Sequence, residues 1–129
     1  MKQAIAVTAL LFLAAADPRQ ELIGHWVGTS ICTAVRPACH DETASYWVKE
    51  NKSENVITID AGKIVDGKDE SMGTSDFRID WKTHTLSGSL GPNGQATMTL
   101  VWSGSTMTGT MKQPDGQVIR NIRLSKQKE

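Results

Sequence analysis

Hydrophobic and polar residues alternate with a period of two along most of the chain beyond residue 25. The clearest case is residues 76–82, in which Phe77, Ile79 and Trp81 occupy every second position and charged residues fill the positions between them. Successive side chains of a β-strand point to opposite faces, so this segment is predicted to be a strand with one dry and one wet face. The same pattern predicts eight strands of about seven residues, at 26–32, 44–50, 56–60, 76–82, 85–90, 95–102, 105–112 and 117–125.

Short turn signals separate the later strands at intervals of about eleven residues. They are Gly91-Pro92-Asn93-Gly94, Ser103-Gly104 and Pro114-Asp115-Gly116. Alternating segments joined by such tight turns indicate consecutive antiparallel hairpins. Earlier in the chain, residues 63–65 are predicted to form a short paired strand, and the polar, Gly-containing residues 68–75 are predicted to be a loop.

These elements predict an all-β fold. No segment beyond residue 16 sustains helical periodicity for three turns, and residues 17–22 are expected to form a single helical or 3-10 turn. A sheet of eight short antiparallel strands hides its two edges best by closing on itself. We therefore predict an up-and-down meander closed into a small barrel, forming a single domain over residues 17–129, with a β-sandwich as the alternative.

The first sixteen residues have the pattern of a secretory signal peptide. Lys2 supplies the positive charge, residues 4–13 form the apolar segment, and Ala14-Ala15-Ala16 offers a cleavage site of small residues. The apolar segment is too short to span a bilayer, which needs roughly twenty residues. We expect cleavage at residue 16 to release the protein into the periplasm or the medium without a membrane anchor.

The two cysteines, Cys32 and Cys39, are predicted to form a disulfide, because an exported chain meets an oxidising environment. Closing this short loop is expected to stabilise the fold by roughly 2.5 kcal/mol on the chain-entropy estimate. The alternative is a pair of free buried thiols. Six residues separate the cysteines, so the C-x-x-C spacing of a redox site is absent.

Charge adds little to the functional picture. The chain has 14 Lys plus Arg and 14 Asp plus Glu, and the two signs are interspersed. This distribution forms neither the basic stripe typical of a nucleic-acid-binding protein nor a basic amphipathic helix suited to a membrane surface. No nucleic-acid partner is therefore expected.

A short motif, Gly24-His25-Trp26, opens the first predicted strand directly after the expected helical turn. A Gly-x-Trp at this place, followed by a β-meander, resembles the calycin group of barrels, which contains lipocalins, fatty-acid-binding proteins and avidins. In lipocalins the tryptophan lies across the closed end of the barrel, and a basic residue of the last strand packs on it. The resemblance implies that Arg120, on the apolar face of residues 117–125, stacks on Trp26.

A wider pattern covers most of the chain after the signal peptide. It includes Gly-x-Trp-x-Gly-x-Ser-x-Cys at 24–32 and Pro-x-Cys-x-Asp-Glu at 37–42. This pattern resembles small exported bacterial proteins of an uncharacterised family. The resemblance implies a compartment and a fold and brings no activity with it.

Polar side chains gather in and beside the predicted disulfide, in the loop of residues 33–43, at Arg36, His40, Asp41 and Glu42. One hypothesis makes the last three a metal or acid/base site. Neighbouring loop residues point in different directions, however, so we favour a structural role in which Asp41 or Glu42 caps loop amides or pairs with Arg36. Neither a cofactor-binding motif nor a nucleophile elbow is present, and no metal site is predicted.

Large apolar side chains share the predicted inner faces of the strands. Those expected to bind a ligand are Trp81, Met98, Trp102, Met107 and Met111. The alternative is that they simply fill the barrel, as side chains do in many eight-stranded barrels. A solvent-connected cavity of a few hundred Å3 would favour a ligand, and a filled interior would move the function to the loops.

The favoured function is that of an exported, lipocalin-like, non-enzymatic protein that binds a small apolar ligand and whose Trp fluorescence is quenched by it. One alternative is a periplasmic protein-interaction module, such as a hydrolase inhibitor, that contacts an exported partner through the Cys32–Cys39 loop. The other is a metal-dependent enzyme that uses His40, Asp41 and Glu42.

Overall fold

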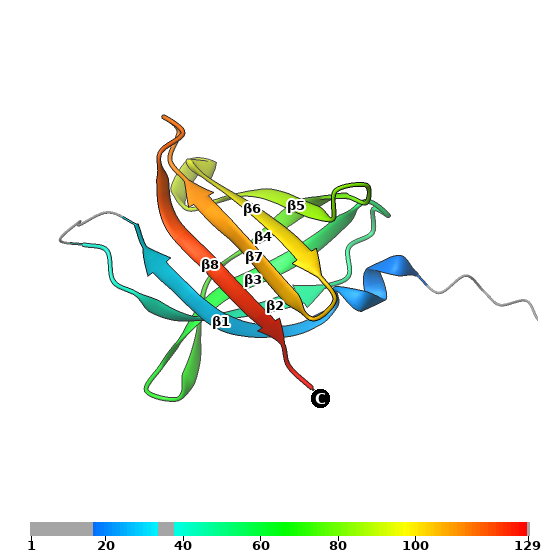
Figure 1. Cartoon of the computed structure of the whole chain (residues 1–129), viewed down its shortest axis with the longest axis horizontal. Coiled ribbons are helices and arrows are strands. Elements are labelled where there is room, and N and C mark those ends of the chain that lie inside the picture. The colour runs from blue at the N-terminus through cyan, green and yellow to red at the C-terminus, as the bar shows by residue number, and fades with distance from the viewer. Residues whose placement is uncertain (1–16, 34–37, 129) are drawn as a thin grey trace, which may run out of the picture.

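The computed structural model describes residues 17–33 and 38–128, and the predicted signal peptide lies outside these ranges. Each strand pairs antiparallel with the next, and the last pairs with the first, so the sheet closes into an eight-stranded barrel (Figure 1). The predicted meander and barrel are confirmed, and the alternative β-sandwich is wrong. The elements are η1 (Pro18–Glu21), β1 (Gly24–Cys32), β2 (Glu42–Lys49), β3 (Val56–Val65), β4 (Lys68–Asp80), β5 (Thr85–Leu90), η2 (Pro92–Gly94), β6 (Ala96–Ser103), β7 (Thr106–Lys112) and β8 (Val118–Lys126).

Strands β3 and β4 form a longer hairpin than the sequence pattern predicts. The prediction of a loop at residues 68–75 is wrong, because these residues pair with β3 along their length, as in the pair Ile64↔Asp69. Both turn residues, Asp66 and Gly67, have positive φ angles of 51° and 78°, as a tight two-residue hairpin turn requires. Backbone pairing with β3 thus keeps this segment in a strand, although the segment is polar, is exposed on most of its surface and has no apolar alternation.

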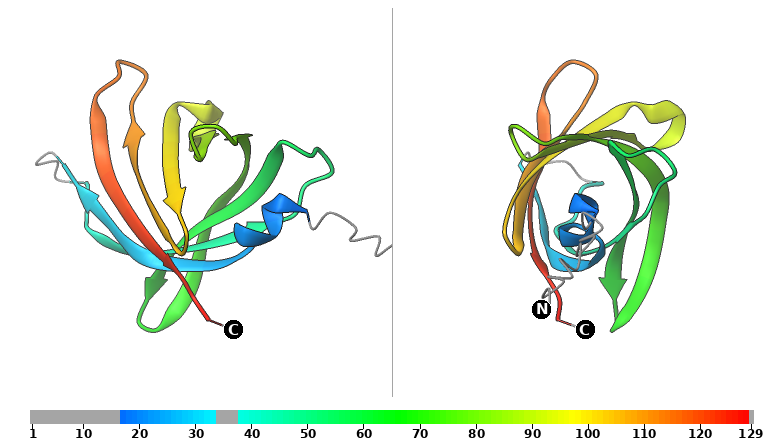
Figure 2. Two further views of the ribbon diagram at one scale, coloured as in Figure 1. Left: turned by 45° about the vertical axis from the view of Figure 1, so that its right-hand side comes forward. Right: turned by 90° about the vertical axis from the view of Figure 1, so that its right-hand side faces the viewer.

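The barrel wall is incompletely paired between β4 and β5. Their pairing runs only from Phe77↔Gly88 to Asp80↔Thr85, so the first nine residues of β4 pair with β3 alone. The β3–β4 hairpin accordingly projects beyond the rest of the barrel (Figures 1 and 2). This leaves a stretch of the wall without backbone pairing between β4 and β5, here called the side opening, near the end of the barrel that lies away from η1.

Inward-facing side chains fill the middle of the barrel. Phe77, Leu86, Met98 and Leu100 are fully buried there. Gly88 makes room for the aromatic ring of Phe77, since a Cβ at this glycine would lie 2.8 Å from that ring. The filled interior expected as an alternative is therefore present over this part of the barrel.

One end of the barrel is closed by η1 and the residues after it (Figure 2, right). Leu22 and Trp26 are fully buried, and the Trp26 indole Nε1 donates a hydrogen bond to the Leu22 carbonyl at 2.8 Å. Gly24 enters β1 with a φ of 143°, a conformation that side chains disfavour, and a Cβ here would lie 3.1 Å from Lys126 Cε. The Gly-x-Trp motif therefore combines a backbone requirement with a plug for the closed end.

The predicted stack of Arg120 on Trp26 is wrong. The register of β1 and β8 places Lys126 opposite Trp26, whereas Arg120 lies opposite Cys32 at the other end of the barrel. Lys126 Nζ lies 6.0 Å from the centre of the Trp26 ring and donates to the Glu21 carbonyl at 2.9 Å. Arg120 and Lys126 are six positions apart on the same face of β8, so alternation alone identifies the face and leaves the register undetermined.

Arg19 fastens η1 to the barrel. Its side chain is 11% exposed, and its guanidinium forms an ion pair with Asp17 at 2.8 Å and donates to the carbonyls of Asn51 and Ser53 at 2.7 and 2.8 Å. The hydrogen bonds from Arg19 lower the pKa of Asp17 below its usual value. The hydrogen bonds to Asn51 and Ser53 thus join the turn before β1 to the β2–β3 connection. Among the residues that the structure describes, no helix is long and apolar enough to span a bilayer.

Candidate functional site

A cavity of about 500 Å3 lies at the end of the barrel opposite η1. All eight strands contribute to its wall, and it reaches solvent near the side opening between β4 and β5. Its volume falls within the range of roughly 300 to 1,000 Å3 that is usual for small-molecule sites. The barrel thus has a filled closed half and a hollow open half.

Apolar atoms form most of the surface of the cavity wall. Leu90, Ala96 and Met111 come from β5, β6 and β7, and Ala61 and Met72 come from the β3–β4 hairpin. Met72 is 52% exposed and stands beside Gly73 at the side opening. Such a wall can bury the hydrocarbon part of a ligand, with about 0.8 kcal/mol gained for each buried methylene group.

Polar groups lie together on the other wall of the cavity, on β1, β2 and β8. Arg120 Nη1 donates to the Ser30 carbonyl at 3.3 Å, the Ser30 Oγ at 3.2 Å and the His40 carbonyl at 3.1 Å. Its Nη2 faces Glu42 Oε1 at 3.5 Å, and the two side chains are 15% and 17% exposed. Both members of this ion pair line the cavity, as does Ser30.

Tyr46 completes the polar wall. The residue is 2% exposed and lines the cavity, and no hydrogen bond to its hydroxyl is found among the described residues. Burial raises the pKa of the Tyr46 phenol above its usual value of 10, and the charge of Glu42 raises it further. The phenol therefore stays neutral and can donate a hydrogen bond into the cavity.

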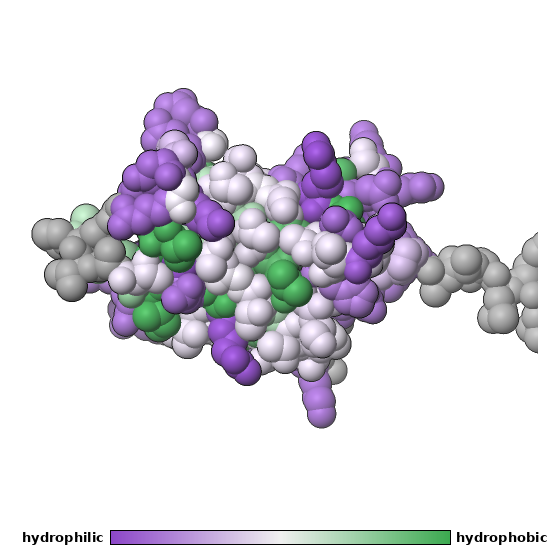
Figure 3. Space-filling view, turned by 45° about the horizontal axis from the view of Figure 1, so that its top comes forward, coloured by the Kyte–Doolittle hydropathy of each residue, from purple (hydrophilic) through white to green (hydrophobic). Residues whose placement is uncertain are grey.

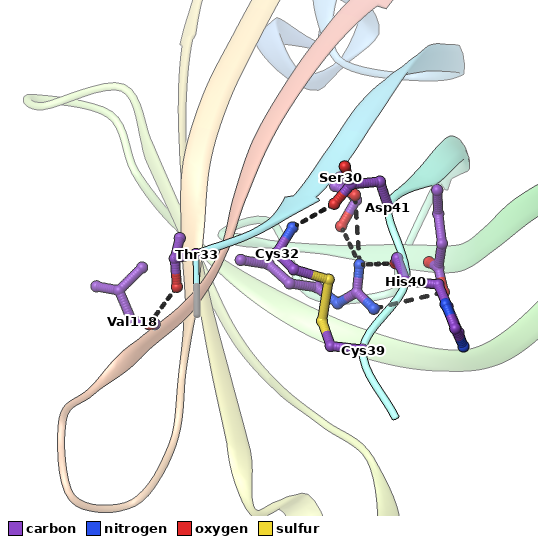
Figure 4. The surroundings of a disulfide bond; sticks show 9 residues. Ser30, Cys32, Thr33, Cys39, His40, Asp41 and Val118 are labelled. Carbon is purple, nitrogen blue, oxygen red and sulfur yellow. Dashed lines mark hydrogen bonds and ion pairs between the residues drawn. A yellow bond between two sulfur atoms is a disulfide. The ribbon is translucent and has the colours of Figure 1, made fainter. Parts of the chain in front are cut away.

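The predicted disulfide between Cys32 and Cys39 is confirmed and lies at the rim of the open end (Figure 4). Asp41 Oδ1 accepts a hydrogen bond from the Cys32 amide at 2.8 Å, so the expected capping role of this carboxylate is confirmed. Thr33 Oγ1 donates to the Val118 carbonyl at 2.6 Å and ties the strand end to β8. Arg36, the remaining predicted member of the loop cluster, lies outside the described residues.

His40, Asp41 and Glu42 do not converge on one point. His40 and Asp41 are exposed, and the Asp41 carboxylate is bonded to a backbone amide, whereas Glu42 turns inward to Arg120. Within residues 17–33 and 38–128, no group of three His, Cys, Asp or Glu side chains is placed to hold a metal ion. The structure therefore separates this trio between the outer rim and the cavity.

Of the five residues predicted to bind a ligand, the structure places only Met111 on the cavity. Met98 and Met107 are fully buried in the filled core. Trp102 is packed against the closed end, where its Nε1 donates to Glu21 at 3.0 Å, and Trp81 meets it edge-on at 5.7 Å. The prediction for these four residues is wrong. Their side chains point into the barrel as expected, but they lie at a different position along the barrel axis from the cavity.

The sequence prediction missed most of the polar wall. Ser30 and Tyr46 carry no distinctive motif, and they gain significance only when the strands bring them beside Glu42 and Arg120. The sequence did point to Arg120 as a residue with a specific role, because a charged residue on an apolar face needs a partner. Its partners are Glu42 and two backbone carbonyls instead of an aromatic ring.

The outer surface offers weaker candidates. His25 stacks on Trp47 with 3.9 Å between ring centres, and its Nε2 hydrogen-bonds with Ser45 Oγ at 2.7 Å. Ser45 is 2% exposed, so its hydroxyl is covered and is not placed to attack a substrate. On the face shown in Figure 3, hydrophobic residues form small separate patches between polar ones, unlike a broad docking surface.

Fold and site together define a small, disulfide-tied antiparallel β-barrel with one closed end and one hollow end. No protein-family model matches the chain, and no curated protein matches it either. The cavity is therefore the feature of the molecule that bears most directly on its function.

Proposed function

We propose that this protein is an exported, lipocalin-like, non-enzymatic barrel that binds a small, mostly apolar molecule in the cavity at its open end. The observation that carries the proposal is the solvent-connected cavity of about 500 Å3 with an apolar wall. Packed interiors contain few voids larger than a water molecule, so a cavity of this size in an otherwise filled barrel favours a ligand.

The construction of the barrel supports a preformed site. The closed half is fixed by η1, Trp26 and the hydrogen bonds of Arg19 to the β2–β3 connection, and the open half is tied by the disulfide and the Arg120 contacts. A site held in its binding conformation spends less free energy on ordering side chains when the ligand enters. The binding role therefore needs no large rearrangement.

Export is part of the proposal. The pattern of residues 1–16 is that of a signal peptide, and a disulfide is typical of oxidising compartments such as the periplasm. An exported binder of this kind would hold poorly soluble molecules outside the cytoplasm.

Titration with the neutral fluorescent probe N-phenyl-1-naphthylamine tests the binding site. Wild-type protein should enhance the probe's emission saturably, and Ala96→Phe, which fills the cavity, should weaken binding by about tenfold or more. Thr97→Phe is the matched control, because Thr97 is the next residue of β6 and is exposed. This probe replaces intrinsic fluorescence, since Trp26, Trp81 and Trp102 lie at the closed end.

Absence of saturable probe binding by the wild type would overturn the proposal. Equal binding by Ala96→Phe and Thr97→Phe would also overturn it, because the probe would then occupy another place. Melting curves of both variants show whether each barrel is folded when it is titrated.

A further inference from the structure

We propose that the ligand is a neutral amphiphile, with an uncharged oxygen-containing head group and a hydrocarbon tail, and that the head group binds between Arg120, Glu42 and Tyr46. This inference rests on the proposed function, since it names the class of ligand for the same cavity. Alcohols, amides and esters share this chemistry. Fatty acids and alkylamines do not.

The first argument is the charge of the cavity. Within residues 17–33 and 38–128, the charged residues that line it are Glu42 and Arg120, and their charges cancel. A ligand carboxylate would gain Arg120 but would bring a second negative charge beside Glu42, and an alkylammonium would meet the reverse difficulty. Burying an uncompensated charge is more costly than burying a neutral polar group that finds hydrogen bonds.

The second argument is the hydrogen-bonding state of Arg120. Its Nη1 has two hydrogens, and three acceptors from Ser30 and His40 already surround it at 3.1 to 3.3 Å. Its Nη2 has Glu42 at 3.5 Å, longer than a good charge-assisted hydrogen bond of about 2.7–2.9 Å. Nη2 therefore keeps capacity to donate to a ligand oxygen, while Glu42 keeps capacity to accept from a ligand hydroxyl or N–H.

The third argument is Tyr46. This residue is almost fully buried and lines the cavity beside Glu42, and its hydroxyl has no hydrogen-bonding partner among the described residues. No fully enclosed side-chain N or O atom in residues 17–33 and 38–128 lacks a hydrogen-bonding partner, so the Tyr46 hydroxyl is accessible from the cavity and can exchange a hydrogen bond with a ligand oxygen. A donor on Arg120, an acceptor on Glu42 and the Tyr46 hydroxyl, which can do both, thus face one small volume, opposite an apolar wall formed by Leu90, Ala96 and Met111.

Calorimetric titration with 1-decanol, decanoic acid and decylamine at neutral pH tests the inference, because the three ligands share one tail and differ in head charge. Wild-type protein should bind the alcohol tightest. Glu42→Gln keeps the shape of the side chain and leaves Arg120 unneutralised, so it should shift the preference toward decanoic acid by about tenfold or more. Tyr46→Phe should weaken alcohol binding several-fold and leave acid and amine weak.

Glu54→Gln is the matched control, since it removes the same charge at the closed end, and it should keep the wild-type order. Tighter binding of decanoic acid or decylamine by the wild type would overturn the inference and leave the proposed function standing. An unchanged ligand order in Glu42→Gln would overturn it as well, because the head group would then lie elsewhere. Failure of all three ligands and of the naphthylamine probe to bind would overturn both proposals.

Discussion

Two basic residues on β8 serve opposite ends of the barrel. Lys126 lies over Trp26 and binds the carbonyls of η1, so it belongs to the closed end. Arg120 is held by Ser30, His40 and Glu42, so it belongs to the cavity. The two residues share a face and differ only in their position along the strand.

Lys126→Ala should destabilise the barrel by about 1 kcal/mol, because it removes both the contact with the Trp26 ring and a cation at the carbonyl end of η1. Urea unfolding followed by Trp fluorescence measures the change. Lys128→Ala, two positions later and exposed, should leave the unfolding free energy unchanged. Equal stability of Lys126→Ala and wild type would remove Lys126 from the closed end.

Asp17 should contribute to acid sensitivity. Its hydrogen bonds with Arg19 lower its pKa in the folded state, so folding favours the ionised form. The resulting stabilisation is complete above the unfolded pKa of about 3.9 and is lost as the pH falls through the lower folded value. Melting temperatures measured from pH 6 down to pH 2 should therefore fall less steeply for Asp17→Asn than for wild type.

The control for this pH profile is Asp69→Asn, on the exposed β3–β4 hairpin, which should follow the wild-type curve. Parallel curves for Asp17→Asn and wild type would show that the Arg19 ion pair does not stabilise the fold. In that case the hydrogen bonds of Arg19 to the β2–β3 carbonyls alone would fasten η1.

At the scale of elements, alternation predicts strands better than it predicts their register. Residues 76–82 alternate clearly, and their apolar face is buried in the barrel as expected. Residues 68–75 were missed because they are exposed on both faces, and only pairing with β3 makes them a strand. The register of β1 with β8 was equally inaccessible, since a shift of six residues keeps every side chain on its predicted face.

The disulfide joins the end of β1 to the segment just before β2, at the rim of the cavity. Replacing Cys32 and Cys39 together by serine should lower the unfolding free energy by about 2.5 kcal/mol, the loop-closure estimate for this short ring. Urea unfolding of the double variant measures the loss. Dithiothreitol should produce a similar loss in the wild type and none in the variant, and unchanged stability of the variant would contradict the account.

At the scale of the whole molecule, the barrel divides into a packed half and a hollow half. The sequence predicted which large side chains point inward, but depth along the barrel axis depends on strand tilt and stagger, which alternation does not encode. For this reason Met98, Met107 and Trp102 were grouped with Met111, although only Met111 lines the cavity. The polar wall of Ser30, Glu42, Tyr46 and Arg120 arises because barrel closure places the last strand, β8, beside β1 and β2.

Binding at the open end is the central claim, and the methionines are placed to test it. Met72 and Met111 line the cavity, whereas Met98 and Met107 are fully buried in the packed core. NMR of protein labelled at the methionine methyl groups, titrated with N-phenyl-1-naphthylamine, should show saturable shifts of the Met72 and Met111 signals and much smaller changes for Met98 and Met107. Unchanged Met72 and Met111 signals, or larger shifts at the two core methionines, would contradict a ligand site in this cavity.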